Sequence, residues 1–218
     1  MLICGIEEAG RGPIIGPMVM CGLLVKEEDE QRLVKLGVKD SKLLTAKQRE
    51  SMFDAIKEIA VKCETIALSP AEIDDAVEKK DGMNLNWLEA KTSAKLINKL
   101  KPDKVIIDCP SPNINAYTSF IRELLDNKNV EILAAHHADV KYPIVSASSI
   151  IAKVTRDSEI VKLKKKIGID FGSGYPADPR TQEFLQKYWI DYEQIFRHSW
   201  KPFKDIAGIK KQKKLDSF

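Results

Sequence analysis

The chain has 218 residues, 44% of them apolar, which is enough for one well-packed domain with a small appendage and too little for two full-sized domains. Its 35 Lys and Arg residues against 32 Asp and Glu residues leave a net charge of only +3, so any contact with nucleic acid must come from local clustering of charge. No apolar run approaches the roughly 18 residues of a membrane span, and the N-terminus lacks the features of a secretory signal. The sequence therefore predicts a cytoplasmic protein with no membrane contact.

Strand and helix signals alternate along the first half of the chain. A loop rich in Gly and Pro separates two apolar runs, which predicts an antiparallel pair of strands. Thr45 with Gln48, and Ser69 with Glu72, have the spacing of capping boxes and predict two helix starts. The predicted elements are strands at residues 2–6, 18–25 and 61–68 and helices at residues 46–60 and 71–77.

In the second half, helical periodicity ends before Pro102 and a short apolar strand follows it, ending in Asp108. Asp178 and Pro179 fit the N-cap and the first position of a later helix. The predicted elements are helices at residues 85–100, 114–125, 146–166 and 179–192 and strands at residues 104–108 and 130–134.

This order of elements is typical of an α/β fold in which helices cover the faces of a mixed sheet. The chain has no internal repeat and no low-complexity linker, so we expect the C-terminal helices to pack against the core rather than to form an independent unit. Four cysteines stand far apart, without metal-binding spacing, and favour small buried side chains in a reducing compartment over structural zinc.

Acidic residues follow or end several of the predicted strands. Glu7 and Glu8 come at the end of the first strand, Asp108 ends another, and Asp139 comes after a further one. Because strand ends converge in such folds, we expect these four carboxylates to form one cluster. Carboxylates at such close range repel one another unless divalent cations neutralise them, and hard oxygen ligands favour Mg²⁺ or Mn²⁺. Each residue taken singly is also compatible with a solvated loop or cap position.

Next to these acids, Gly10, Arg11 and Gly12 form a turn in which backbone amides can approach a ligand closely and Arg11 can bind an anion. The alternative is a tight turn with a surface arginine. The spacing of the glycines matches neither a Walker phosphate loop nor a dinucleotide fingerprint, which disfavours nucleotide-cofactor chemistry.

Basic and aromatic residues elsewhere are candidates for nucleic-acid contact. Lys42, and Lys153 with Arg156, could meet phosphates, although charges on helices are more often solvated. Tyr175, between glycine and proline, could stack on a sugar or base or close the edge of the core.

Several multi-residue motifs together resemble the ribonuclease HII family, the type 2 ribonucleases H, in the family's order and over nearly the whole chain. The stretch at residues 198–201 is similar to the archaeal branch. The motifs are residues 5–13 with Gly16 and Pro17, residues 40–42, Asp108, residues 138–157 and residues 172–176.

The resemblance implies a ribonuclease H-like fold with a small C-terminal helical extension. It implies an endonuclease that hydrolyses the RNA strand of RNA/DNA hybrids and nicks 5′ to ribonucleotides in duplex DNA, leaving 5′-phosphate and 3′-hydroxyl ends by a two-metal mechanism. The expected catalytic domain is residues 1–176, followed by the helical extension at residues 177–208 and a basic tail at residues 209–218, in a monomer. By the same resemblance, the metal ligands include Glu8, Asp108 and Asp139, and the ribose 2′-hydroxyl is read by Gly10, Arg11, Gly12 and Tyr175.

One position departs from the family pattern, in which the first carboxylate is ordinarily Asp and here is Glu7. The extra methylene extends the carboxylate by at most about 1.5 Å, and a misplacement of this size can cost about 100-fold in rate. We expect retained activity that is reduced in Mg²⁺ and relatively better in Mn²⁺. The alternative is a hybrid-binding or clamp-tethered module with impaired catalysis. DNA-cutting enzymes of related fold are disfavoured, since the residues that read a 2′-hydroxyl would have no role in them.

The C-terminal tail offers a second function. Gln212, Leu215 and Phe218 resemble the motif by which proteins bind a sliding clamp, and lysines flank them. A frayed basic tail is the alternative.

Overall fold

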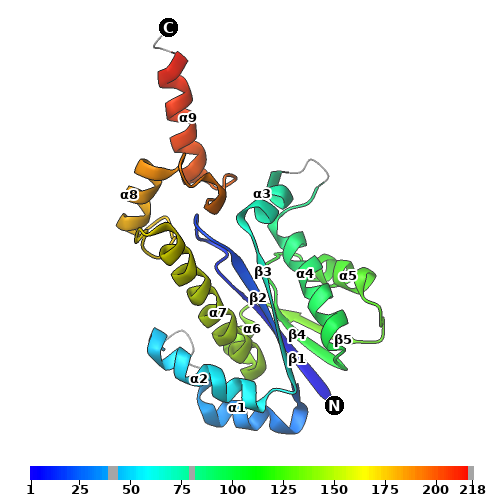
Figure 1. Cartoon of the computed structure of the whole chain (residues 1–218). Coiled ribbons are helices and arrows are strands. Elements are labelled where there is room, and N and C mark those ends of the chain that lie inside the picture. Colours follow the sequence, from blue (N-terminus) through cyan, green and yellow to red (C-terminus); the bar gives the residue numbers. More distant parts are fainter. Residues whose placement is uncertain (39–43, 79–81, 216–218) are drawn as a thin grey trace.

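The computed structural model describes residues 1–38, 44–78 and 82–215. Within these residues the centre is a mixed sheet of five strands in the order β3-β2-β1-β4-β5 (Figure 1). β1 pairs antiparallel with β2 and parallel with β4, as the sequence predicts for the first pair. The strands are β1 (Leu2–Ala9), β2 (Met18–Lys26), β3 (Lys62–Leu68), β4 (Lys104–Asp108) and β5 (Glu131–Ala135).

Helices cover both faces of the sheet, so β1 and β2 are buried almost throughout. On one face α7 (Pro143–Ile167) packs against both strands, and on the other α4 (Leu85–Leu100) and α5 (Ile114–Leu124) contribute to a second apolar cluster (Figure 1). The approach of α7 is so close that a Cβ at Gly5 would lie 2.6 Å from the carbonyl oxygen of Ile144. Side chains alternate along a strand, so Ile3 belongs to the cluster under α7 and Cys4 and Ile6 to the cluster under α4.

Most predicted elements are confirmed, including both capping boxes. β1 runs three residues further than predicted, and α7 begins three residues earlier because Pro143 suits the first turn of a helix. α8 (Pro179–Tyr188) ends four residues early, and α9 (Lys201–Leu215) continues through the predicted start of the tail. The remaining helices are α1 (Glu30–Leu36), α2 (Ala46–Ile59), α3 (Pro70–Glu78), α6 (Ala138–Lys141) and the 3-10 turns η1 (Glu27–Asp29) and η3 (Glu193–Ile195).

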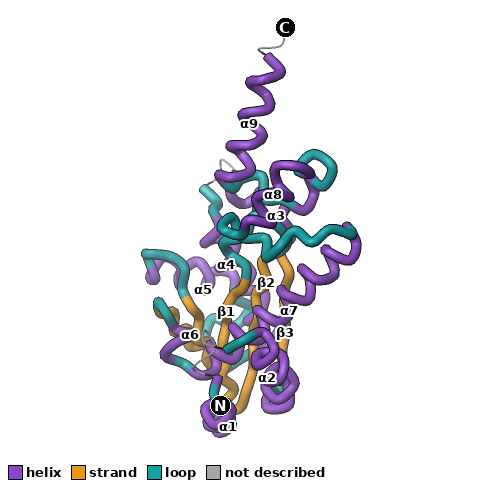
Figure 2. The backbone as a smooth tube through the Cα atoms, turned by 90° about the vertical axis from the view of Figure 1, so that its left-hand side faces the viewer, coloured by secondary structure: helices purple, strands orange, loops and turns teal. Residues whose placement is uncertain are grey.

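The C-terminal helices share a third apolar cluster with the loop between β1 and β2. Ile14 and Ile15 of this loop pack with Phe171, Phe184 and Phe196. α8 and the start of α9 therefore rest on the core, as expected, while α9 projects away from one end of the molecule (Figure 2).

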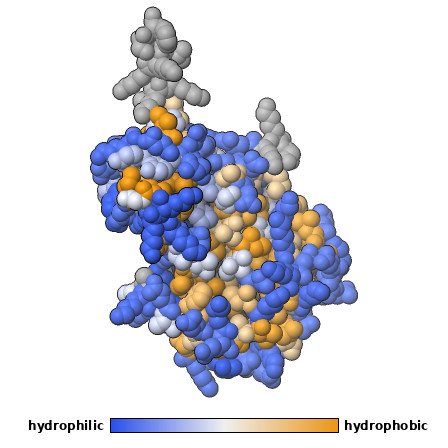
Figure 3. Space-filling model, in the orientation of Figure 1, coloured by the Kyte–Doolittle hydropathy of each residue, from blue (hydrophilic) through white to orange (hydrophobic). Residues whose placement is uncertain are grey.

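The surface carries both hydrophilic and apolar residues. In Figure 3 hydrophilic residues cover much of the face shown, and apolar residues gather in its middle and lower part and in a patch at its upper left. None of the described helices has the length and apolar character to cross a membrane. All four cysteines are unpaired thiols, and all but Cys63 are buried.

Candidate metal centre and substrate cleft

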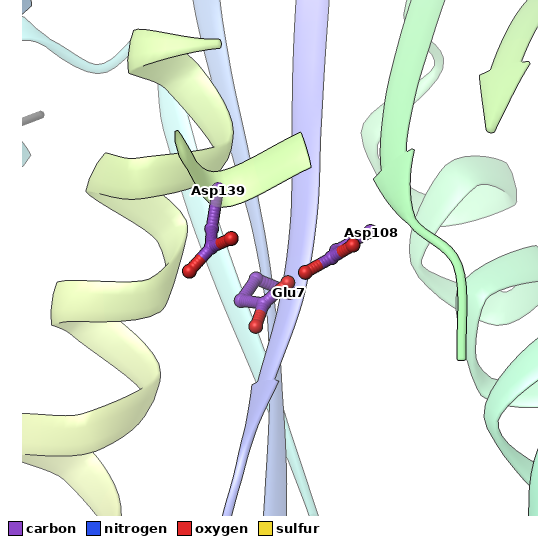
Figure 4. A group of neighbouring side chains, drawn as sticks. All are labelled: Glu7, Asp108 and Asp139. Atoms are coloured by element: carbon purple, nitrogen blue, oxygen red, sulfur yellow. The ribbon is translucent and has the colours of Figure 1, made fainter. Parts of the chain in front are cut away.

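Three carboxylates meet at one end of the sheet. Glu7 lies near the end of β1, Asp108 is the last residue of the neighbouring parallel strand β4, and Asp139 lies on α6, which follows β5. One oxygen from each residue lies within 4.8 Å of the others (Figure 4). The predicted convergence of acidic side chains is thus present for these three residues.

Local backbone geometry fixes two of the three side chains. His137 adopts a left-handed conformation with φ 56°, which turns the chain from β5 into the short helix α6. The next backbone amide, of Ala138, donates a hydrogen bond of 3.1 Å to Oδ1 of Asp108. Asp139 follows and is only 4% exposed, so one turn orients both aspartates.

The electrostatics of this group favour a bound cation. Glu7 is 8% exposed, and its Oε2 is buried without a hydrogen-bond partner among the described residues. Burial, followed by repulsion from Glu8, Asp108 and Asp139, raises the pKa of Glu7 well above its ordinary value. Since the donors are all carboxylate oxygens, the residues present fit a hard divalent cation such as Mg²⁺ or Mn²⁺.

Glu8 lies outside this three-carboxylate group, which differs from the expectation of a single four-residue cluster. Because β1 extends through Ala9, Glu7 and Glu8 are neighbours on one strand and face opposite sides of the sheet. Glu8 faces α4, and burial together with repulsion from Glu89 and Asp108 raises its pKa to about 8. Glu8 still lines the same cavity as the other three acids.

Arg11 is held by α4. Its Nε donates to Oε1 of Glu89 at 2.8 Å, and its Nη2 donates to Oδ1 of Asn86 at 2.6 Å. Glu89 is fully buried, and burial raises its pKa to about 7 although the charge of Arg11 opposes the rise. Two nitrogens of the Arg11 guanidinium are therefore engaged with protein groups, and the turn at residues 10–12 lines the cavity.

The acids open into a cavity of about 500 Å³ that also holds the predicted substrate-reading residues. Basic side chains from α2 and α7 also line it. The lining consists of residues 7–12, Arg49, Asp108, Asp139, Lys153, Arg156, Asp157 and Tyr175.

Gly10, Arg156 and Tyr175 form one wall of this cavity. Gly10 has φ +85°, and a Cβ at this position would lie 2.2 Å from Nε of Arg156, so only glycine fits. The guanidinium of Arg156 stands over the ring of Tyr175 at 5.3 Å, and Tyr175 remains 42% exposed. The ring is thus supported from one side and accessible from the cavity.

The other predicted site residues are placed only in part. Lys153 lines the cavity and donates to Oγ of Ser149 at 2.6 Å. Lys42 lies outside the described residues. Gln212 and Leu215 fall within the backbone of α9, their side chains are not described, and Phe218 lies outside the described residues.

Two residues that line or support the cavity were not predicted from the sequence. Glu89 interrupts the apolar face of α4, and an acid in such a stripe is a usable signal of a buried polar contact. Arg49 reaches the cavity from α2 and approaches Asp157 at 3.9 Å, but nothing in its sequence context marks it.

Comparison with known proteins identifies the family. The ribonuclease HII family model matches residues 4–203. The chain belongs to the ribonuclease HII family. It is therefore a metal-dependent ribonuclease, and the binding module without catalysis is not favoured.

Individual relatives agree with this assignment over nearly the whole chain. Ribonuclease HII of Methanocella arvoryzae is 45% identical, covering 99% of this chain and 96% of the relative. The crystal structure of ribonuclease H2 from Pyrococcus horikoshii superposes with a TM-score of 0.86 at 41% identity, covering 95% and 98% of the two chains. The structure of the PCNA:RNase HII complex from Archaeoglobus fulgidus gives a TM-score of 0.81 at 39% identity, covering 92% and 96%. The ribonuclease H-like fold and the similarity to archaeal members are thus confirmed.

Proposed function

We propose that this ribonuclease HII hydrolyses the RNA strand of RNA/DNA hybrids and nicks duplex DNA on the 5′ side of embedded ribonucleotides, leaving 5′-phosphate and 3′-hydroxyl ends. The observation that carries the proposal is the convergence of Glu7, Asp108 and Asp139 in a cavity shared with the glycine turn and Tyr175. An acidic centre suits phosphodiester hydrolysis, and the neighbouring turn and ring suit recognition of a sugar.

In this proposal Glu7, Asp108 and Asp139, together with Glu8, hold Mg²⁺ or Mn²⁺. Divalent ions bound there supply activation of a water and stabilisation of the leaving 3′-oxygen. Glu7 fills the position that is ordinarily Asp in the family, and its longer side chain still brings an oxygen within 4.8 Å of those of Asp108 and Asp139. The backbone amide of Ala138 keeps Asp108 oriented toward the group.

We assign substrate recognition to other residues that line the same cavity. The 2′-hydroxyl is both donor and acceptor and is the group that distinguishes RNA from DNA. Gly10 to Gly12 offer backbone groups at close range, and the exposed ring of Tyr175 offers a surface for the neighbouring sugar. Lys153 and Arg156 line the same cavity and are placed to meet phosphates, and we propose the same role for Lys42.

The test is cleavage of a labelled DNA duplex that contains one ribonucleotide, in Mg²⁺, in Mn²⁺ and in chelator, beside an all-DNA duplex. We expect a metal-dependent nick 5′ to the ribonucleotide and no cut in the all-DNA duplex. Asp139→Asn should lose at least about 100-fold in rate, whereas Asp54→Asn, an exposed aspartate on α2, should not change it. Equal cutting of both duplexes, or cutting in chelator, would overturn the proposal.

We also propose that Gln212, Leu215 and Phe218 bind a sliding clamp, in a cytoplasmic protein that is otherwise monomeric. The support is the motif itself and the similarity of this chain to the ribonuclease HII of the Archaeoglobus fulgidus PCNA:RNase HII complex. Deletion of residues 212–218 should abolish clamp binding in a pull-down and leave cleavage of short duplexes intact. Unchanged clamp affinity would reject this role.

A further inference from the structure

Arg197 lies behind the glycine turn and is fully buried. Its guanidinium donates hydrogen bonds to three backbone carbonyls of the loop between β1 and β2. Nη1 donates to the oxygen of Arg11 at 2.9 Å, and Nη2 donates to the oxygens of Gly10 at 2.7 Å and Gly16 at 3.1 Å. Nε adds a bond of 3.2 Å to Gly16. The rigid fork of an arginine matches such a set of acceptors, and a lysine cannot reproduce it.

Trp200 extends the same arrangement. Its ring stacks under the guanidinium of Arg197, with 5.0 Å between the guanidinium carbon and the ring centre. Its indole Nε1 donates to the oxygen of Gly12 at 3.3 Å. The carbonyls of Gly10, Arg11 and Gly12 are therefore all bound by side chains of one C-terminal segment.

Because the peptide bond is planar, binding these carbonyls also fixes the direction of the backbone N–H groups in the turn. In a trans peptide the N–H of the next residue points opposite to the carbonyl. With the carbonyls of Gly10 and Arg11 bound to Arg197, the N–H groups of Arg11 and Gly12 point away from Arg197. Gly10, Arg11 and Gly12 line the cavity with Tyr175, so the donors face the side where a sugar would lie.

The segment that carries Arg197 is itself anchored. Its backbone amide donates to the oxygen of Ile14 at 2.9 Å. The next two amides, of His198 and Ser199, donate to the carboxylate of Asp74 on α3 at 2.8 and 2.9 Å. The ring of His198 stacks on Phe203 at 4.2 Å. The guanidinium thus holds a fixed position relative to the core.

We propose that Arg197 is a specificity-positioning residue, assisted by Trp200, which fixes the backbone amides of Arg11 and Gly12 in the orientation that reads the ribose 2′-hydroxyl. This inference rests on the proposed function. The simpler alternative is that Arg197 only satisfies buried carbonyls and stabilises the fold. If Arg197 positions the turn, its loss changes the discrimination between ribose and deoxyribose. If its role is only structural, its loss changes stability alone.

The experiment uses the full chain in chelator, where no cleavage occurs, and measures by fluorescence anisotropy the Kd for two duplexes that differ in one ribose 2′-hydroxyl. The readout is the ratio of the two Kd values. Arg197→Lys should reduce this ratio at least tenfold, and Trp200→Phe, which keeps a ring but removes the bond to Gly12, about threefold. Phe184→Leu is the matched control, because it weakens the same apolar cluster without touching the turn, and its ratio should stay unchanged.

The outcomes separate the two proposals. Wild-type protein that nicks at ribonucleotides and discriminates in binding, together with an unchanged ratio in both Arg197→Lys and Trp200→Phe, overturns the inference alone. An equal reduction in Phe184→Leu also overturns it, since the effect would then follow from stability. Wild-type protein that neither nicks at ribonucleotides nor discriminates overturns the proposed function. Should Arg197→Lys fail to fold, Trp200→Phe decides the question.

Discussion

Glu89 allows a direct test of how burial acts on the acidic side of the cleft. It is fully buried on α4 and carries its charge beside Arg11 and near Glu8. Folding raises its pKa from the ordinary 4.5 to about 7. The replacement Glu89→Gln keeps the shape of the side chain and an oxygen that can accept from Arg11, but it removes the charge that burial penalises.

The raised pKa of Glu89 determines whether the free energy of unfolding rises or falls with pH. The folded state holds the proton more tightly than the unfolded state, so the associated stability is fully present below pH 4.5 and is lost as the pH rises to about 7. At about 1.4 kcal/mol for each pH unit between the two pKa values, the loss is about 3 kcal/mol. The glutamine in Glu89→Gln does not titrate, so the free energy of unfolding of this variant does not decrease for this reason.

The assay is denaturant unfolding of metal-free protein in chelator at pH 4.5, 5.5, 6.5 and 7.5. Between the lowest and highest pH, the free energy of unfolding of the wild type should fall relative to that of Glu89→Gln by about 3 kcal/mol. Glu58→Gln, at an exposed glutamate on α2, should show no such change relative to the wild type. A constant difference between the wild type and Glu89→Gln would refute the argument that burial dominates the electrostatics of this residue.

Three further predictions concern the cavity. Because the pKa values of Glu7 and Glu8 are raised, protons compete with cations for these carboxylates. The increase in Tm caused by Mg²⁺ in thermal scans should therefore be larger at pH 8.5 than at pH 6. An equal increase at both pH values would place the cation elsewhere. Glu7→Asp should raise the cleavage rate in Mg²⁺ by about tenfold and lower the preference for Mn²⁺, and identical metal preferences in variant and wild type would contradict the assigned role of its length. Gly10→Ala forces a Cβ to within 2.2 Å of Arg156 Nε at φ +85°, so it should lower the free energy of unfolding by about 1–3 kcal/mol in denaturant titrations; wild-type stability would mean that the turn relaxes freely.

The sequence predicted the elements whose boundaries depend on local chemistry. Helical periodicity and Pro102 place α4 and β4 with the observed bounds, and the capping boxes place the starts of α2 and α3. The convergence of acids at strand ends also followed from pattern alone. Glu8 lines the same cavity but is not part of the group of three, which the sequence did not predict because the first strand was expected to end at Ile6. Once β1 extends to Ala9, the alternation of side chains along a strand separates Glu7 from Glu8.

The contacts that complete the cleft were beyond the reach of sequence patterns. Glu89 meets Arg11 across 78 positions of the chain, and Arg197 meets Gly10 across 187. Periodicity and capping describe neighbours within a few residues, so they carry no information about such pairs. The same limit applies to Arg49, which no sequence pattern predicts as a cavity residue. Only the packing of α2 beside α7 brings it to the cavity.

The long separation between Arg197 and the turn it binds bears on the order in which the protein becomes competent during synthesis. Translation proceeds from the N-terminus, so the acidic residues and the glycine turn leave the ribosome well before the segment that follows α8. A nascent chain that ends before residue 197 already contains Glu7, Asp108 and Asp139 but lacks the group that fixes the turn. Such a chain has the residues for hydrolysis and the turn and ring that contact the target, but it lacks the arginine that we propose to orient the turn, so on this proposal selectivity is the last property to be acquired.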